Sequence, residues 1–78
     1  MKFKVGDFIG HLPTLQNNQL NASKILKIES DHYLLSFGYE LPFNNEDRYV
    51  LIKHSEDESD RVTKEDILRI VPSFNFDY

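Results

Sequence analysis

Short runs of β-branched and aromatic residues, each ended by turn-forming residues, constrain the fold of this chain more than any other feature. The clearest run is RYVLIK, residues 48–53, because Tyr, Val and Ile favour the pleated surface of a strand and no Gly or Pro interrupts them. In the run HYLLSF, the period of two places Tyr33, Leu35 and Phe37 on one face. The predicted strands are residues 8–12, 23–29, 32–37, 48–53 and 68–71. We therefore expect a mostly β protein.

The segments between these runs predict loops and one helical turn. Residues 13–21, PTLQNNQLN, are rich in turn formers and amides and predict a loop. Residues 38–47, GYELPFNNED, predict an extended loop that carries aromatic side chains. Thr63 is suited to cap a helix, with Asp66 in the position of a capping box, so a short helical turn is expected before the last strand.

The length and composition predict one small domain that comprises residues 1–78. A chain of 78 residues can enclose a single core, and its 40% hydrophobic content is enough for folding. The chain has no cysteine, which excludes disulfides and thiolate chemistry and favours the cytoplasm. No apolar run approaches the roughly 20 residues of a membrane span, so no membrane association is expected.

Four segments together resemble small SH3-like β-barrels of the Tudor, chromo-barrel and KOW type. These segments are VGDFI, SKILKI, HYLLSF and VTKEDILRIVP. The resemblance implies a barrel of about five strands with one short helical turn before the last strand. It also implies a non-enzymatic module that binds a protein or peptide through exposed aromatic residues and loops.

Aromatic residues near a carboxylate suggest where such a module would hold a ligand. The family presents aromatic side chains to cationic groups, and here Tyr39, Glu40 and Phe43 lie in the enlarged loop, with Tyr49 in the next predicted strand. Aromatic faces and a carboxylate both attract a cation, so these four residues are the candidate ligand-binding site. The alternative is that they pack over an open end of the barrel.

The segment HSEDESD, residues 54–60, is the second candidate surface. Its carboxylates, Glu56, Asp57, Glu58 and Asp60, form either a partner-binding acidic loop or a solvated one. Acidic side chains can also imitate phosphates, so an inhibitor that mimics nucleic acid, of phage or mobile-element origin, is an alternative function. A net charge of -4 disfavours direct binding of nucleic acid, although the barrel resemblance leaves it open.

Catalytic and metal-binding patterns are weak in this sequence. His11, His32 and His54 are each separated by more than twenty residues, so no zinc-ligand spacing occurs. The three glycines do not form a phosphate-binding loop. We therefore expect no enzyme activity, no metal and no cofactor, and the oligomeric state is left open.

Overall fold

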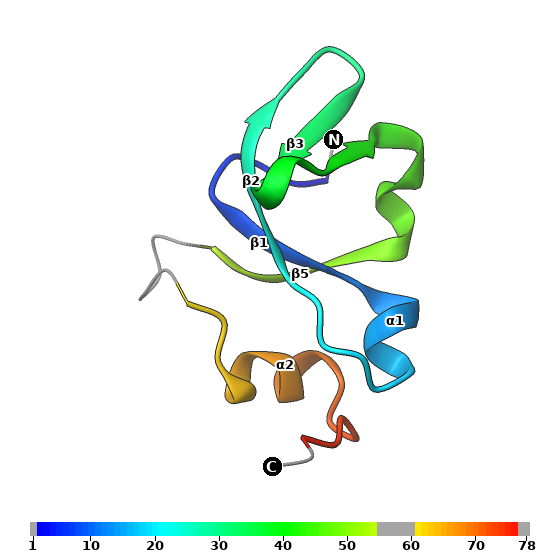
Figure 1. Ribbon diagram of the computed structural model, residues 1–78. Helices are drawn as coiled ribbons and strands as arrows, with labels where there is room; N and C mark the ends of the chain where they lie inside the picture. Colours follow the sequence, from blue (N-terminus) through cyan, green and yellow to red (C-terminus); the bar gives the residue numbers. More distant parts are fainter. Residues whose placement is uncertain (1, 55–60, 77–78) are drawn as a thin grey trace.

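The computed structural model describes residues 2–54 and 61–76, in which five strands form one antiparallel sheet in the order β4-β3-β2-β1-β5 (Figure 1). The strands are β1 (Asp7–His11), β2 (Ser23–Ile28), β3 (His32–Leu35), β4 (Glu40–Pro42) and β5 (Tyr49–His54). The helices are α1 (Leu12–Gln16) and α2 (Lys64–Ile70), with 3₁₀ segments η1 (Ser36–Gly38) and η2 (Phe43–Arg48). The prediction of a mostly β protein is confirmed.

The sheet is bent through β2 and remains open. The first two residues of β2 pair with β1, whereas the rest of the strand pairs with β3, so β2 belongs to both halves of the sheet. The register shifts in β2 between Ile25 and Lys27, and such irregularities bend a strand. Because β4 and β5 lie at opposite edges, the described strands form an open sheet and do not close into a barrel.

Four of the predicted strands correspond to β1, β2, β3 and β5, but the strand predicted at residues 68–71 is wrong. This segment continues α2, whose N-terminus carries a complete capping box between Thr63 and Asp66. Ile67 and Val71 are both buried four residues apart, whereas Leu68 is exposed, which is the spacing of a helix face. The capped turn therefore extends into a helix that ends just before Pro72.

The two predicted loops contain regular structure. In residues 13–21, Pro13 stands in the first turn of α1, a position where its missing N–H costs nothing. In residues 38–47, Leu41 alternates with exposed neighbours and pairs with Tyr33, which makes Glu40–Pro42 an edge strand. Pro42 at the end of this strand is typical of an edge position.

The buried side chains form two clusters rather than the single core expected from the length. Phe8 and Ile9 are neighbours on β1 and point to opposite faces, so each belongs to a different cluster. The sheet cluster contains Phe3, Ile9, Ile25, Tyr33, Leu35 and Leu41. The helix cluster contains Phe8, Leu15, Ile52, Ile67, Val71 and Phe74. The strand β1 is therefore covered on both faces.

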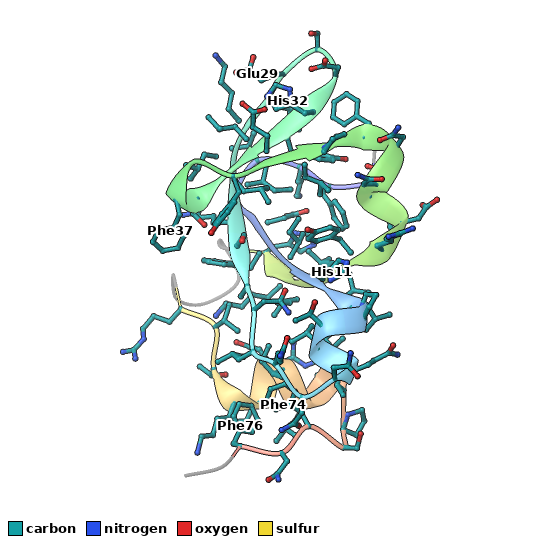
Figure 2. The ribbon with its side chains drawn as sticks, turned by 45° about the vertical axis from the view of Figure 1, so that its right-hand side comes forward. His11, Glu29, His32, Phe37, Phe74 and Phe76 are labelled. Atoms are coloured by element: carbon teal, nitrogen blue, oxygen red, sulfur yellow. The ribbon has the colours of Figure 1, made fainter. Side chains whose placement is uncertain are left out.

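The C-terminal tail is tied to the segment that follows α1. The Asn18 side chain accepts a hydrogen bond from the backbone N–H of Asn75 at 2.6 Å and donates one to its carbonyl at 2.9 Å. Phe74 is buried in the helix cluster, and its ring centroid lies 4.6 Å from that of Phe76. Figure 2 shows both rings beside α2, at the end of the molecule away from the β2–β3 hairpin.

Gly10 is expected to tolerate no side chain without a loss of stability. A Cβ at this position would lie 2.9 Å from Leu15 Cδ1, 3.1 Å from Ile52 Cδ1 and 3.2 Å from the Asn21 carbonyl oxygen. We expect Gly10→Ala to lower the free energy of unfolding by about 1 kcal/mol, because two buried side chains and a backbone must shift. Urea denaturation measures this, and an unchanged midpoint for Gly10→Ala would contradict the packing.

Candidate functional site

Two grooves meet on the surface at Tyr39. The apolar groove has a volume of about 510 Å³, and the residues that line it alone are Leu20, Ala22, Phe37, Val62, Thr63, Lys64, Ile67 and Phe76. The polar groove has a volume of about 410 Å³, and its distinctive lining residues are His11, Thr14, Leu35, Glu40 and Tyr49. Asn21, Ser23 and Tyr39 line both grooves. The two grooves therefore share a wall and form one continuous candidate surface.

Phe37 stands at one wall of the apolar groove and is 89% exposed. The prediction that the strand continues to Phe37 and places it on one face with Tyr33 and Leu35 is wrong, because β3 ends at Leu35 and η1 breaks the alternation. Its backbone has φ 65°, a left-handed conformation that is uncommon for an aromatic residue. Figure 2 shows the ring projecting outward from η1. Strained backbone and an exposed aromatic ring together are typical of a contact residue rather than a packing one.

The opposite wall of the apolar groove is built by α2 and the tail. The capping box fixes the N-terminus of α2, because Thr63 Oγ1 accepts from the Asp66 N–H and the Asp66 carboxylate accepts from the Thr63 N–H. The Lys64 ammonium lies 5.5 Å from the centroid of the Phe76 ring. This wall therefore depends on a helix cap and on the packing of the tail, and both elements come from the last quarter of the chain.

A buried ionic network connects α2, the helix in this wall, to strand β5 of the sheet. Lys53 on β5 is only 8% exposed, and its ammonium donates to the carbonyl of Arg61 and lies 3.4 Å from Asp66 Oδ2. Arg69 contacts the other oxygen of Asp66 at 3.1 Å. The hydrogen bond from the Thr63 backbone N–H lowers the pKa of Asp66, with further help from Lys53, so this carboxylate is held in its charged form.

The polar groove is lined by one histidine among the described residues, His11. His11 ends β1, and the register of β1 and β5 places it directly opposite Tyr49, with ring centroids 5.1 Å apart. Its Nδ1 lies 2.7 Å from Thr14 Oγ1, and its backbone N–H donates to Asn21 Oδ1 at 2.6 Å. The ring is therefore held in place from α1 and β5.

Glu40 supplies the carboxylate of the polar groove. It also lies near a second histidine, since His32 Nε2 is 3.9 Å from Glu40 Oε2 across the β3–β4 pair. The hydrogen bond with Asp31 is the main cause that raises the pKa of His32, and Glu40 adds to it. Both His32 and Glu29 lie near the β2–β3 hairpin, away from His11 (Figure 2).

The structure brings three of the four predicted ligand-binding residues together. Tyr39, Glu40 and Tyr49 line the polar groove. Phe43 lines neither groove, because its ring packs edge-on against Tyr33 at 5.0 Å at the border of the sheet cluster. Phe43 therefore follows the packing alternative. The acidic residues Glu56, Asp57, Glu58 and Asp60 lie outside the described residues.

Two contributors to the grooves were missed from sequence. His11 was not among the predicted ligand-binding residues, because its approach to Tyr49 depends on the pairing of β1 with β5. Phe37 was predicted to lie in a strand, on one face with Tyr33 and Leu35, although the Gly that follows it was a signal that the strand ends there. In the described part of the chain, no three His, Cys, Asp or Glu side chains gather as a metal site, and no helix is both long and apolar enough to cross a membrane.

Comparisons with known proteins give no relationship on which to base a function. No protein family, curated protein or solved structure matches this chain.

Proposed function

We propose that this chain is a non-enzymatic binding module that holds an extended peptide segment of a partner protein across the two grooves. The observation that carries the proposal is Phe37, an 89% exposed aromatic ring on strained backbone at the edge of an apolar groove of about 510 Å³. Aromatic residues beside pockets of this kind are the usual anchors of protein recognition. The absence of cysteine favours the cytoplasm as the place where it acts.

The apolar groove suits an aliphatic side chain of the partner. Leu20, Phe37 and Phe76 line it from three different segments, and Leu20 is 58% exposed. Burial of such surfaces against an aliphatic side chain contributes roughly 25 cal/mol for each square ångström removed from water. This groove is therefore expected to supply most of the affinity.

The polar groove suits a cationic side chain next to that anchor. Tyr39 and Tyr49 provide aromatic rings and Glu40 provides a carboxylate, and both kinds of group attract lysine or arginine. The net charge of -4 steers a basic segment towards the protein from a distance. The candidate partner thus carries an aliphatic residue near a lysine or arginine.

A relationship to SH3-like barrels remains part of the proposal. Its support is the element order, in which β2 is shared by two halves of a bent sheet and β5 returns to pair with β1. A helical turn before the last strand also occurs, although it is η2 before β5 rather than the turn at Thr63. Proteins with such folds have many different functions, so the proposed function rests on the two grooves and not on the fold.

Replacement of Phe37 tests the proposal. The probes are short blocked peptides with one leucine and one lysine at varied separation in an alanine–glycine background, and their binding is measured by calorimetry. We expect Phe37→Asn to weaken the best of them about tenfold or more. Thermal stability should not fall, because Asn tolerates a left-handed backbone better than Phe.

Leu26→Asn is the matched control, since Leu26 is 50% exposed but lies in neither groove. It should leave the affinity unchanged. Equal affinities for the two variants, or no binding of any peptide to the parent protein, would refute the proposed site.

A further inference from the structure

The strand β2 has a neighbouring strand along only part of one edge. On one side its first two residues pair with β1. On the other side β3 pairs with β2 only from Ile25 onward, because β3 ends at Leu35, the partner of Ile25. The chain just before Ile25 therefore has an edge that no described strand covers. Asn21 and Ser23, which belong to this segment, line both grooves.

Ala22 directs its backbone N–H and carbonyl to this open edge. The backbone groups of successive residues in a strand alternate between its two edges. The Lys24 N–H donates to Ser36 Oγ at 3.2 Å, on the side of β3, whereas the Ile25 carbonyl accepts from the Gly6 N–H at 2.9 Å, on the side of β1. The same alternation turns the backbone groups of Ala22 away from β1. Neither group has a hydrogen-bond partner among the described residues, although Ala22 is half-buried.

The two grooves lie on opposite faces of the sheet beside this edge. The apolar groove is lined by Ile67 of the helix cluster, and Ala22 packs against that cluster. The polar groove is lined by Leu35 of the sheet cluster, and Tyr49 packs against that cluster. The two clusters occupy opposite faces of β1. A strand added beside Ala22 would therefore direct alternate side chains into the two grooves.

We infer that the partner peptide binds as an added strand whose backbone hydrogen-bonds to Ala22, with its aliphatic and cationic residues adjacent in sequence. The inference rests on the proposed function and specifies how the peptide is held. An extended peptide supplies both the N–H and the carbonyl that an open strand edge lacks. The net charge of -4 complements a basic segment. Ser36 Oγ already occupies the Lys24 N–H, so the added strand ends at Ala22 and continues away from β3.

Hydrogen exchange measured by NMR tests the backbone contact. The ¹⁵N-labelled protein is compared alone and with a saturating peptide in which leucine and lysine are adjacent. We expect the Ala22 amide to exchange about tenfold or more slowly in the complex, because it gains a hydrogen-bond acceptor. The Ser23 amide is the internal control. It faces β1 in the ladder, where Ser23 is paired with Ile9, and its exchange should change much less.

Two changes to the peptide test the same contact from the partner's side. Insertion of one alanine between leucine and lysine puts both side chains on one face, so we expect binding to weaken about fivefold or more. Replacement of backbone amides by esters, one at a time, removes single N–H donors. One position should lose about fivefold in affinity, and the positions next to it should lose little, because their N–H groups point away from β2.

These results can fail in distinguishable ways. If the adjacent leucine–lysine peptide binds but leaves the Ala22 amide unprotected, the added strand is refuted while the proposed function stands. The same conclusion follows if the peptide with the inserted alanine binds as tightly, or if no ester position is sensitive. If no leucine–lysine peptide binds at all, the proposed function fails and the inference fails with it.

Discussion

Replacement of Asp66 by alanine lowers the free energy of unfolding by about 3 kcal/mol, the largest effect expected of any single substitution considered. Asp66 is 5% exposed and contacts Lys53, Arg69 and the Thr63 N–H. Its removal leaves the buried Lys53 ammonium without a carboxylate partner among the described residues, and it also deletes half of the capping box of α2. Removal of one charge from a buried ion pair destabilises a protein more than replacement of both charges, because the remaining charge stays buried and uncompensated.

Urea denaturation of Asp66→Ala, Lys53→Met and Glu65→Ala measures this. Lys53→Met should be much milder than Asp66→Ala, because it puts an apolar side chain into a buried position and leaves Asp66 with the Thr63 N–H and Arg69. Glu65 is the exposed neighbour in the same turn of α2 and should change little. If Asp66→Ala is no more damaging than Glu65→Ala, the network does not anchor α2.

Removal of the Tyr33 hydroxyl is expected to lower the free energy of unfolding by about 2 kcal/mol. This oxygen accepts hydrogen bonds from the backbone N–H groups of Lys2 at 3.1 Å and Phe3 at 3.3 Å, and it donates to Glu46 Oε2 at 2.5 Å. Tyr33→Phe leaves the Phe3 N–H without its partner at a buried position. It also removes the hydrogen bonds by which the Tyr33 side chain holds the N-terminal segment and Glu46 of η2.

The effect of Tyr33→Phe should depend on pH. The hydrogen bond from Tyr33 lowers the pKa of Glu46, so it contributes stability above the unfolded pKa of a glutamate that is lost as the pH falls through the folded pKa. Denaturation at neutral and acidic pH should show the variant approaching the parent protein in acid. Tyr39→Phe, at an exposed tyrosine, is the control. A constant difference at all pH values would contradict the role of Glu46.

Local sequence patterns were sufficient for much of the fold. The strands β1, β2, β3 and β5 and the cap at Thr63 follow from residues that are adjacent in the chain. The length of α2 was not predicted, because its apolar run before Pro72 fits a strand as well as a helix. Burial of Ile67 against β5 and the tail decides between the two, and that contact is long-range.

The candidate site depends still more on long-range contacts. Tyr39, Glu40 and Tyr49 were selected by residue type and do line one groove. Phe43 was selected for the same reason, yet η2 turns its ring against Tyr33. The position of His11 follows from strand register, which no local pattern in the sequence specifies.

The most direct measurement of the central claim is an NMR titration of the uniformly ¹⁵N-labelled protein with the best leucine–lysine peptide. We expect the largest chemical-shift changes on residues of both grooves, namely Leu20, Ala22, Phe37, Tyr39, Glu40 and Phe76. Changes centred instead on the β2–β3 hairpin around Glu29, or an absence of changes at saturating peptide, would contradict it.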